Sequence, residues 1–189
     1  MDAGLDERRS QIGIGNVIAI HMSEEIVNRV AQSKLVTFDL ENLYPNGERI
    51  LFDIKDWLYE EIVLREKEFR AFVEEHDWSK YQNTYVALTC SVDAIVPGWA
   101  YMLIASRLSP YAKRIIVGDV EQLESAIYQT ILENYDFSDL KGKPVIIKGC
   151  SNKPVPQDAY LLATAKIQSF AKSVMYGEAC SSVPIFKRK

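Results

Sequence analysis

The sequence has no excess of basic residues. Its 189 residues include 22 lysine and arginine side chains against 26 aspartate and glutamate side chains, for a formal net charge of -4. The single run of three basic residues is Lys187–Lys189. Surfaces that bind nucleic acid or an anionic membrane carry clustered positive charge. The composition therefore argues against a general nucleic-acid binder and against a membrane-surface protein.

Long hydrophobic runs are also missing. No apolar stretch approaches the roughly 20 residues needed to span a bilayer. The N-terminus lacks the basic segment, apolar run and small-residue cleavage site of a secretory signal. We therefore expect a cytoplasmic protein.

Familiar catalytic and nucleotide-binding motifs are absent from the sequence. The two histidines, His21 and His76, do not form an H-E-x-x-H pair, and no G-x-S-x-G occurs. Gly13-Ile14-Gly15 and Lys141-Gly142-Lys143 lack the spacing of dinucleotide and phosphate-binding loops. The sequence thus gives no support for standard hydrolase chemistry or nucleotide binding.

Cysteine is scarce. The three cysteines are an odd number, too few for a disulfide framework. In a reducing compartment they are expected to be free thiols, metal ligands or inert packing residues. They are the one feature of this sequence that can carry chemistry.

Residues 1–21 differ in composition from the rest of the chain, so we predict an N-terminal extension there, disordered or tag-like, and a single α/β domain over residues 22–189. An upstream start, or an extra strand through Val17 to Ile20, is the alternative for the first segment. Ser23 is a natural helix N-cap just after Met22, and Ile26, Val27 and Val30 form an apolar stripe. The fold is accordingly expected to start near Met22.

The first part of the domain is predicted to be an antiparallel β-hairpin unit. Apolar and polar residues alternate over 35–40 and again over 49–54, on either side of a Tyr-Pro-Asn-Gly turn sequence. Residues 57–64 suit a third strand. Residues 65–76 read as an amphipathic helix.

From about Asp77 the sequence alternates between strand-like and helix-like segments. The expected strands are 84–89, 114–117 and 144–148, with a final edge strand over 183–187. The expected helices are 97–108, 119–133 and 156–175. Short apolar strands separated by helices pair in parallel through right-handed crossovers. The predicted fold class is therefore α/β or α+β, with the hairpin unit joined to a mostly parallel βαβαβα layer sandwich.

Each cysteine begins a similar phrase. Cys90-Ser91 and Cys150-Ser151 are each followed by a Val-Pro pair and then by Ala-Tyr, whereas Cys180-Ser181 is followed more closely by Val-Pro alone. The first two phrases run from a predicted strand into a helix with proline at its start. The carboxyl ends of parallel strands form the crevice where ligands bind. Cys90 and Cys150 are thus expected to face such a crevice, near helix N-termini that favour thiolates.

Cys180 is harder to join to this pair. A helix of some 20 residues from Pro156 would carry the chain roughly 30 Å to the opposite edge of the sheet. A three-cysteine site then requires a reversed strand or a second subunit.

The leading hypothesis is a metal site formed by Cys90, Cys150, Cys180 and Asp93. Thiolates bind soft metals, so zinc, iron or an iron-sulfur cluster are the expected cofactors. Asp119 and Asp158 are alternative ligands, although capping of helix N-termini is the more common role for such residues. The cysteines equally suit small buried side chains at tight junctions.

Five phrases in order resemble an uncharacterised bacterial family known only as a domain of unknown function, DUF2480. They are Phe52–Leu58, Tyr85–Ser91, Val96–Tyr101, Lys148–Ser151 and Met175–Pro184. The resemblance covers about Glu24 to Lys187 and leaves residues 1–21 outside. It implies one conserved module and brings no activity with it.

Two further classes of function stay open. One is a non-catalytic interaction module, expected to be a homodimer, whose cysteines only pack. The other is a thiol enzyme with Cys90 or Cys150 as nucleophile, which needs a carboxylate, lysine or tyrosine as base. The sequence names neither a substrate nor a catalytic residue.

Overall fold

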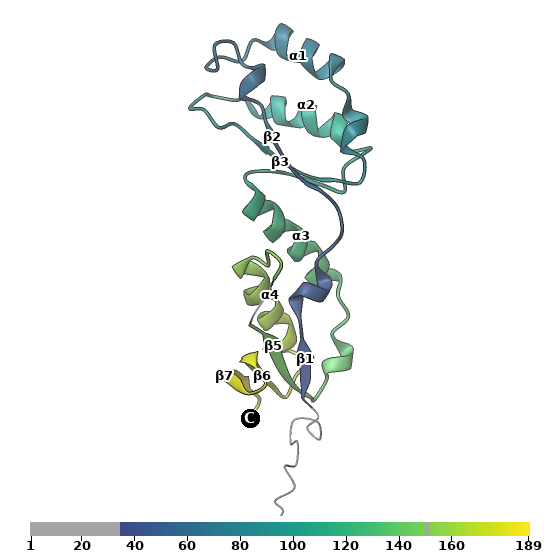
Figure 1. Ribbon diagram of the computed structural model, residues 1–189, viewed down its shortest axis with the longest axis vertical. Helices are drawn as coiled ribbons and strands as arrows, with labels where there is room; N and C mark the ends of the chain where they lie inside the picture. Colours follow the sequence, from purple (N-terminus) through teal and green to yellow (C-terminus); the bar gives the residue numbers. More distant parts are fainter. Residues whose placement is uncertain (1–34, 150–151) are drawn as a thin grey trace, which may run out of the picture. The chain divides into compact units, whose positions relative to one another are not determined.

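The computed structural model describes residues 35–149 and 152–189 (Figure 1). They belong to one compact unit, Ser33–Lys189. The predictions for residues 1–21, for the helix after Ser23, and for Cys150 and Ser151 lie outside the described residues. None of the described helices is long and apolar enough to cross a membrane.

The structure is a mixed α/β fold, which confirms the predicted fold class. The strands are β1 (Val36–Phe38), β2 (Arg49–Asp53), β3 (Tyr85–Thr89), β4 (Arg114–Val117), β5 (Pro144–Lys148), β6 (Ser173–Glu178) and β7 (Ser181–Lys187). The α-helices are α1 (Glu66–Glu75), α2 (Gly98–Leu108), α3 (Val120–Asn134) and α4 (Gln157–Ile167).

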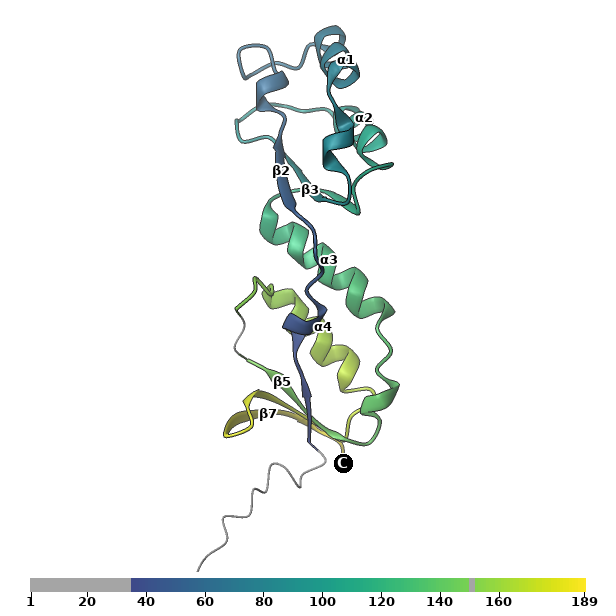
Figure 2. The ribbon, with the colours of Figure 1, turned by 45° about the vertical axis from the view of Figure 1, so that its right-hand side comes forward.

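The strands form two sheets rather than one. Sheet A has the order β1-β5-β6-β7, and sheet B has the order β2-β3-β4. Neighbouring strands are parallel in both sheets except for β6 and β7, which form an antiparallel ribbon (Figure 2). The final edge strand predicted near the C-terminus is therefore present.

The predicted hairpin does not form. β1 pairs with β5 and β2 pairs with β3, so these two strands belong to different sheets. The connection between them contains a short 3₁₀ helix, Leu40–Leu43, and is too long for a two-residue turn. Each strand instead lies beside a strand whose middle residues are apolar and buried, and this burial outweighs the local turn signal.

Two other predicted elements differ from the structure. Residues 57–64 form no third strand: a 3₁₀ helix, Lys55–Trp57, is followed by a tight turn closed by a bridge between Tyr59 and Val63. The predicted helix over 156–175 is too long, because α4 ends at Ile167 and β6 begins at Ser173. Val174 is fully buried between β5 and β7, and that packing overrides helix propensity.

The two sheets are an internal repeat in identical register. Tyr85 pairs with Arg114 in sheet B, and Pro144 pairs with Ser173 in sheet A, 59 positions further along the chain. The same spacing relates α1 to α3 and α2 to α4. Helix α2 connects β3 to β4 as α4 connects β5 to β6. The similar cysteine phrases are thus part of a longer repeat.

Details between the helices and strands repeat as well. Asp77 accepts hydrogen bonds from the backbone and hydroxyl of Ser79, and Asp136 does the same for Ser138, 59 positions on. Gly118 directly follows β4, and Gly177 lies within β6 at the matching position of the repeat. Both glycines have a positive φ. A Cβ on Gly177 would lie 2.6 Å from the Ser181 carbonyl oxygen, so the turn into β7 requires glycine there.

The first strand of each sheet follows a different spacing. Phe38 pairs with Ile147 in sheet A, and Phe52, 14 positions on, pairs with Leu88 in sheet B. Asp39 and Asp53 follow these phenylalanines and accept hydrogen bonds from the backbone two residues ahead. Sheet A therefore takes its first strand from the start of the described chain.

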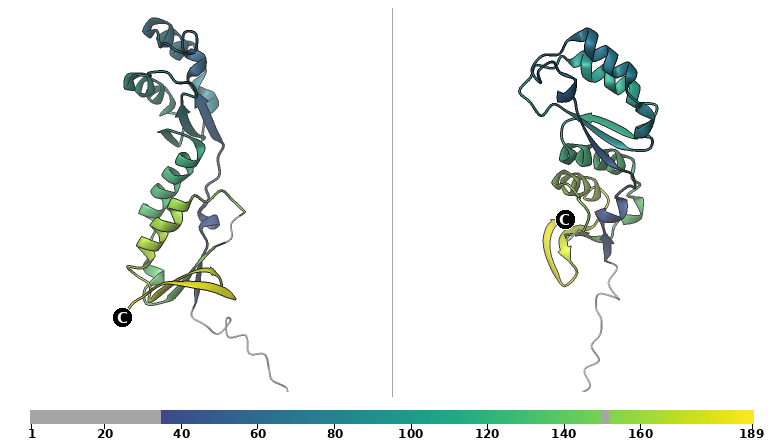
Figure 3. Two further views of the ribbon diagram at one scale, coloured as in Figure 1. Left: turned by 90° about the vertical axis from the view of Figure 1, so that its left-hand side faces the viewer. Right: turned by 45° about the horizontal axis from the view of Figure 1, so that its top comes forward.

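Each sheet packs a pair of helices on one face. In sheet B, α1 and α2 lie side by side over Phe52, Val86 and Leu88 (Figure 3). In sheet A, α3 and α4 cover Val145 and Ile147. Helix α3 also covers the second face of sheet B through Leu123 and Ile127, so it belongs to both cores.

Candidate functional site

The carboxyl end of sheet B holds Cys90, directly after β3. The thiol is half-buried, packs against the core of sheet B, and donates a hydrogen bond of 3.5 Å to the carbonyl oxygen of Val92. Asp53, at the end of β2, accepts a hydrogen bond of 3.1 Å from the backbone of Ser91. Cys90 is thus held in place by packing and by its own loop.

Two ionisable groups beside Cys90 have shifted pKa values. Burial would raise the pKa of Asp53, but hydrogen bonds from Ser91 and Lys55 hold it below its usual value. Burial, and then the neighbouring Cys90 and Asp53, raise the pKa of Tyr101. At neutral pH this edge therefore combines an ionised carboxylate with a neutral phenol.

The carboxyl end of sheet A has a different set of polar groups. The Lys148 ammonium lies 2.8 Å from Asp39 Oδ2 and 3.2 Å from Glu41 Oε2. Glu41 Oε1 accepts hydrogen bonds from the backbone amides of Asn152 and Lys153. These bonds raise the pKa of Lys148 and, despite desolvation, lower the pKa of Glu41. The carboxylate tethers the loop that precedes α4.

Cys180 lies at this same end of sheet A. It is exposed in the turn between β6 and β7. The expectation that it lies at the opposite edge is wrong, because it assumed a helix up to Met175, whereas β6 returns the chain parallel to β5. Glu178, the last residue of β6, follows Gly177, which pairs with Lys148.

The strand register does not place the two Cys-Ser phrases at equivalent positions. Leu88 pairs with Val117 and its counterpart Ile147 pairs with Tyr176, so the counterpart of Cys90 is Gly149. A Cβ on Gly149 would lie only 3.1 Å from the ring of Tyr176 and 3.2 Å from the Gly177 Cα. In this alignment Cys150 comes one residue later than Cys90, which matches the loop being one residue shorter before its Val-Pro.

Two of the residues predicted as metal ligands, Cys90 and Cys180, follow strands of different sheets. Cys90 follows Thr89, which pairs with Asp53 at the end of β2. Lys153, in the loop before α4, lies 5.3 Å from the centroid of the Tyr44 ring. Tyr44 donates a hydrogen bond to Glu124, and Glu124 pairs with Arg49, the first residue of β2. Within residues 35–149 and 152–189 no three histidine, cysteine, aspartate or glutamate side chains form a metal-binding group.

The acidic candidates have structural positions. Asp119 is the N-cap of α3: it accepts a hydrogen bond of 2.8 Å from the Gln122 amide, and Gln122 Oε1 accepts one from the Asp119 amide. Asp158 lies in the first turn of α4. Asp93 is exposed in the loop after Cys90.

Beside Cys90, two loops form an exposed apolar surface that sequence reasoning missed. We call it the Ile95 surface, and its residues are Ile62, Val63 and Ile95. Ile95 is 94% exposed and Ile62 is 62% exposed. These residues line a depression of about 560 Å³ together with Asp93 and Pro97. The available signal was an apolar run, Ala94–Val96, in a segment predicted to be a loop.

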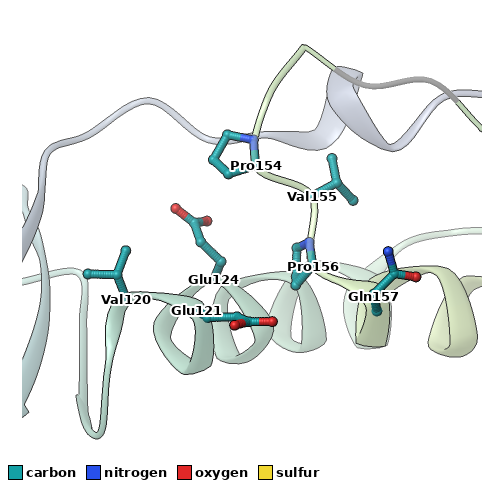
Figure 4. Close-up of a pocket in the computed structure, with 7 residues that line it drawn as sticks. All are labelled: Val120, Glu121, Glu124, Pro154, Val155, Pro156 and Gln157. Carbon is teal, nitrogen blue, oxygen red and sulfur yellow. The ribbon is translucent and has the colours of Figure 1, made fainter.

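A second depression of about 370 Å³ lies between the starts of α3 and α4 (Figure 4). Its lining is mostly apolar, with Val120 on one side and Pro154, Val155 and Pro156 on the other. Glu124 at its floor is buried and pairs with Arg49 at 2.7 Å. Its one buried charge is therefore already neutralised.

Comparison with known proteins identifies one family. The family model described as "Protein of unknown function (DUF2480)" matches residues 24–188. The chain belongs to this DUF2480 family. No curated protein and no solved structure matches it significantly. Membership in DUF2480 confirms the resemblance carried by the five phrases, and the family description assigns no activity.

Proposed function

We propose that this DUF2480 protein is a non-catalytic interaction module that binds a segment of another protein on the Ile95 surface. The observation that carries the proposal is the exposure of Ile95, 94%, beside Ile62 and Val63 at the rim of one depression. Exposed apolar side chains gathered in this way mark sites of protein interaction. The surface also lies beyond the carboxyl ends of parallel strands, where ligands bind in such sheets.

The backbone on one side of the Ile95 surface is held in an uncommon conformation. Glu60 and Glu61 have φ values of 50° and 58°, in the left-handed region that L residues adopt at a cost. Two hydrogen bonds between Tyr59 and Val63, of 2.8 and 3.1 Å, close the turn. A surface fixed before binding loses less conformational entropy when a partner docks.

The charge around this surface indicates the chemistry of the partner. Residues 56–64 and 91–97 carry four carboxylates, on Asp56, Glu60, Glu61 and Asp93. The nearest basic side chain in the turn, Arg65, lies over the Tyr59 ring and pairs with Glu68. An apolar centre with an acidic rim fits a segment in which apolar residues are flanked by lysine or arginine. The proposed ligand class is therefore a basic, apolar peptide segment.

Titration of fluorescently labelled peptides tests this proposal. Peptides with leucine and isoleucine flanked by lysines are compared with peptides in which glutamate replaces lysine. The basic peptides should bind at least about tenfold more tightly, a difference of ~1.4 kcal/mol. Binding should weaken in Ile95→Asp and in the double variant Glu60→Lys, Glu61→Lys.

Leu161→Asp is the matched control. Leu161 is also an exposed apolar residue, but it lies on α4, which packs on sheet A, whereas the Ile95 surface belongs to sheet B. It should bind like the parent protein. Equal affinity for both peptide classes, or an unchanged affinity in Ile95→Asp, would contradict the proposal.

Our second proposal is a metal site with thiolate ligands, in which the ligands differ from the four residues predicted from the sequence. The strands β5 and β6 are neighbours, and in the sequence Cys150 comes two residues after β5 ends and Cys180 two residues after β6 ends. We propose that these two thiols, with ligands from a second chain, hold zinc, iron or an iron-sulfur cluster. A four-coordinate thiolate site needs the second chain because each chain supplies two of the thiols.

Metal analysis of untagged protein purified without oxygen tests this site. Bound metal should be lost in Cys150→Ser and in Cys180→Ser, and should remain in the control Cys90→Ser. Protein that binds no zinc or iron, or whose metal content depends on Cys90 alone, would contradict the second proposal.

A further inference from the structure

The internal repeat shows a strand that one sheet has and the other lacks. In sheet A, β7 pairs with the outer edge of β6. The counterpart of β6 in sheet B is β4, and no described strand pairs with its outer edge. After β4 the chain turns at Gly118 directly into α3, so nothing equivalent to β7 follows.

Within residues 35–149 and 152–189, no strand pairs with the backbone groups on the outer edge of β4, and the side chains beside this edge are apolar. The Gly118 amide donates to the Leu88 carbonyl oxygen at 2.9 Å, so by alternation the amides of Ile115 and Val117 point away from β3. Val117 is 59% exposed, and Met102 on α2 is 73% exposed. An edge of this kind, without proline or an inward charge at its centre, is a template for pairing with another strand.

A depression beside β4 matches the place that a β7 side chain fills in sheet A. It has a volume of about 220 Å³ and is lined by Tyr101, Met102, Ile115 and Val117, among others. Val174, the counterpart of Ile115, pairs with Phe186 of β7, which packs against the core of sheet A. The structure of sheet A thus indicates that an antiparallel strand covers this position.

We propose that β4 of a second copy of this chain is that strand, so that the protein is a homodimer with a continuous six-stranded sheet. Antiparallel pairing of a strand with itself closes by a two-fold axis, which needs no second surface. β7 of another copy is a poorer occupant, because its proline and irregular register interrupt pairing and it is already held by β6. This dimer goes beyond the Ile95 surface, which lies at the strand ends rather than along β4.

The faces of the sheet fix the register of the pair. Opposite residues in antiparallel strands point to the same face, and Ile115 shares the face of Val117, opposite to Ile116. Several registers keep like faces opposed, but only a two-fold axis beside Ile116 pairs both outward residues with each other, because the neighbouring registers use the amides of Lys113 or Asp119, which already bond to Thr84 and Gln122. Ile116 then lies opposite the partner's Ile116. Ile115 lies opposite the partner's Val117, and these two exchange hydrogen bonds through the outward amides. Helix α2 and its Met102 then meet the same helix of the second copy.

Sedimentation of the full chain over a range of concentrations tests the dimer. The parent protein should dimerise, and Val117→Lys should weaken dimerisation at least about tenfold, because it places two lysines in the paired edge. Leu51→Lys is the control: Leu51 is 51% exposed on β2, the other edge of sheet B, and its variant should dimerise normally. A monomeric parent protein, or equal effects of both variants, would overturn the proposal.

Cross-linking decides the register even where Val117→Lys does not fold. In a background with Cys180→Ser, Ile116→Cys should form a disulfide-linked dimer on mild oxidation, since opposite Cα atoms in a non-hydrogen-bonded antiparallel pair lie about 4.5 Å apart, a separation that a disulfide can bridge. Leu51→Cys in the same background should not. If the parent protein stays monomeric and an added extended peptide covers β4 instead, the strand that pairs with β4 comes from another molecule. That result would overturn the choice of a second copy.

Discussion

At the scale of single residues, Glu41 is a carboxylate that holds a loop in place and has no catalytic role in this account. It accepts hydrogen bonds from the amides of Asn152 and Lys153 and pairs with Lys148, so one side chain joins the end of β5 to the approach to α4. Its counterpart in sheet B is Lys55, which makes no such contact with the loop after Cys90. The two strand ends therefore share a fold but differ in charge.

The lowered pKa of Glu41 has a definite consequence for stability. Since the folded-state pKa lies below the unfolded value, the ionised carboxylate stabilises the fold above about pH 4.3, and this contribution is lost as pH falls through the folded-state pKa. Glu41→Gln should be less stable than the parent protein at pH 7, and the difference should become smaller at pH 3. Urea unfolding at both pH values measures this.

Glu48→Gln is the matched control, because Glu48 is an exposed carboxylate in the same connection. It should leave stability nearly unchanged at pH 7. A Glu41→Gln protein whose stability follows that of the parent at every pH would show that the carboxylate does not anchor the loop.

Cys90 illustrates what a residue pattern can and cannot predict. The first two Cys-Ser phrases correctly marked connections in which a strand leads through a short loop to a helix. They did not show which positions are equivalent in the repeat. Because the second loop is one residue shorter, the residue equivalent to Cys90 is Gly149 and not Cys150. The exposure of Ile95 was likewise hidden, because an apolar residue in a loop looks the same in sequence whether it packs or faces solvent.

At the scale of elements, α3 depends on a buried ion pair with β2. Arg49 donates to Glu124 at 2.7 Å, and both side chains are nearly inaccessible to solvent. Arg49 also donates to the carbonyl oxygens of Pro45 and Gly47, and Tyr44 donates to Glu124. The pair thus connects the start of sheet B and the strand-to-strand connection with the helix shared by both cores.

Glu124→Ala should destabilise the protein by ~3–5 kcal/mol, because it leaves the Arg49 guanidinium buried without its partner. The double variant Arg49→Met, Glu124→Leu should lose less, since it removes both charges together. Chemical denaturation measures both, with Glu121→Ala on the exposed face of α3 as the control. A double variant less stable than Glu124→Ala would contradict this view of the pair.

The strands and helices themselves were largely predictable from sequence. β4 and β5 coincide with the predicted segments, because continuous apolar runs bounded by turn residues specify buried strands. Strand pairing was not predictable in the same way. β1 lies beside Val145 and Ile147, more than a hundred residues away in the chain, and no local pattern records that contact.

At the scale of the whole molecule, the repeat explains where open surfaces occur. Both sheets have the same register, the same crossover and the same helix pair. Sheet A continues into β7, and its loop before α4 is tethered by Glu41. In sheet B no described strand pairs with the outer edge of β4, so that edge is open, and the Ile95 surface is exposed although Asp53 accepts a hydrogen bond from Ser91 in its loop. The proposed protein-binding surfaces therefore both belong to sheet B, whereas the proposed thiolate metal site belongs to the end of sheet A.

Methyl NMR spectroscopy during titration with a lysine-flanked apolar peptide tests this account most directly, because it reports on each isoleucine and valine. The account predicts that the methyl signals of Ile62, Val63 and Ile95 shift in saturable fashion. It also predicts that the signals of Val183 and Ile185 on β7 stay in place. Shifts confined to β7, or no shift at Ile95 with a peptide that binds, would contradict the assignment of the binding surface to sheet B.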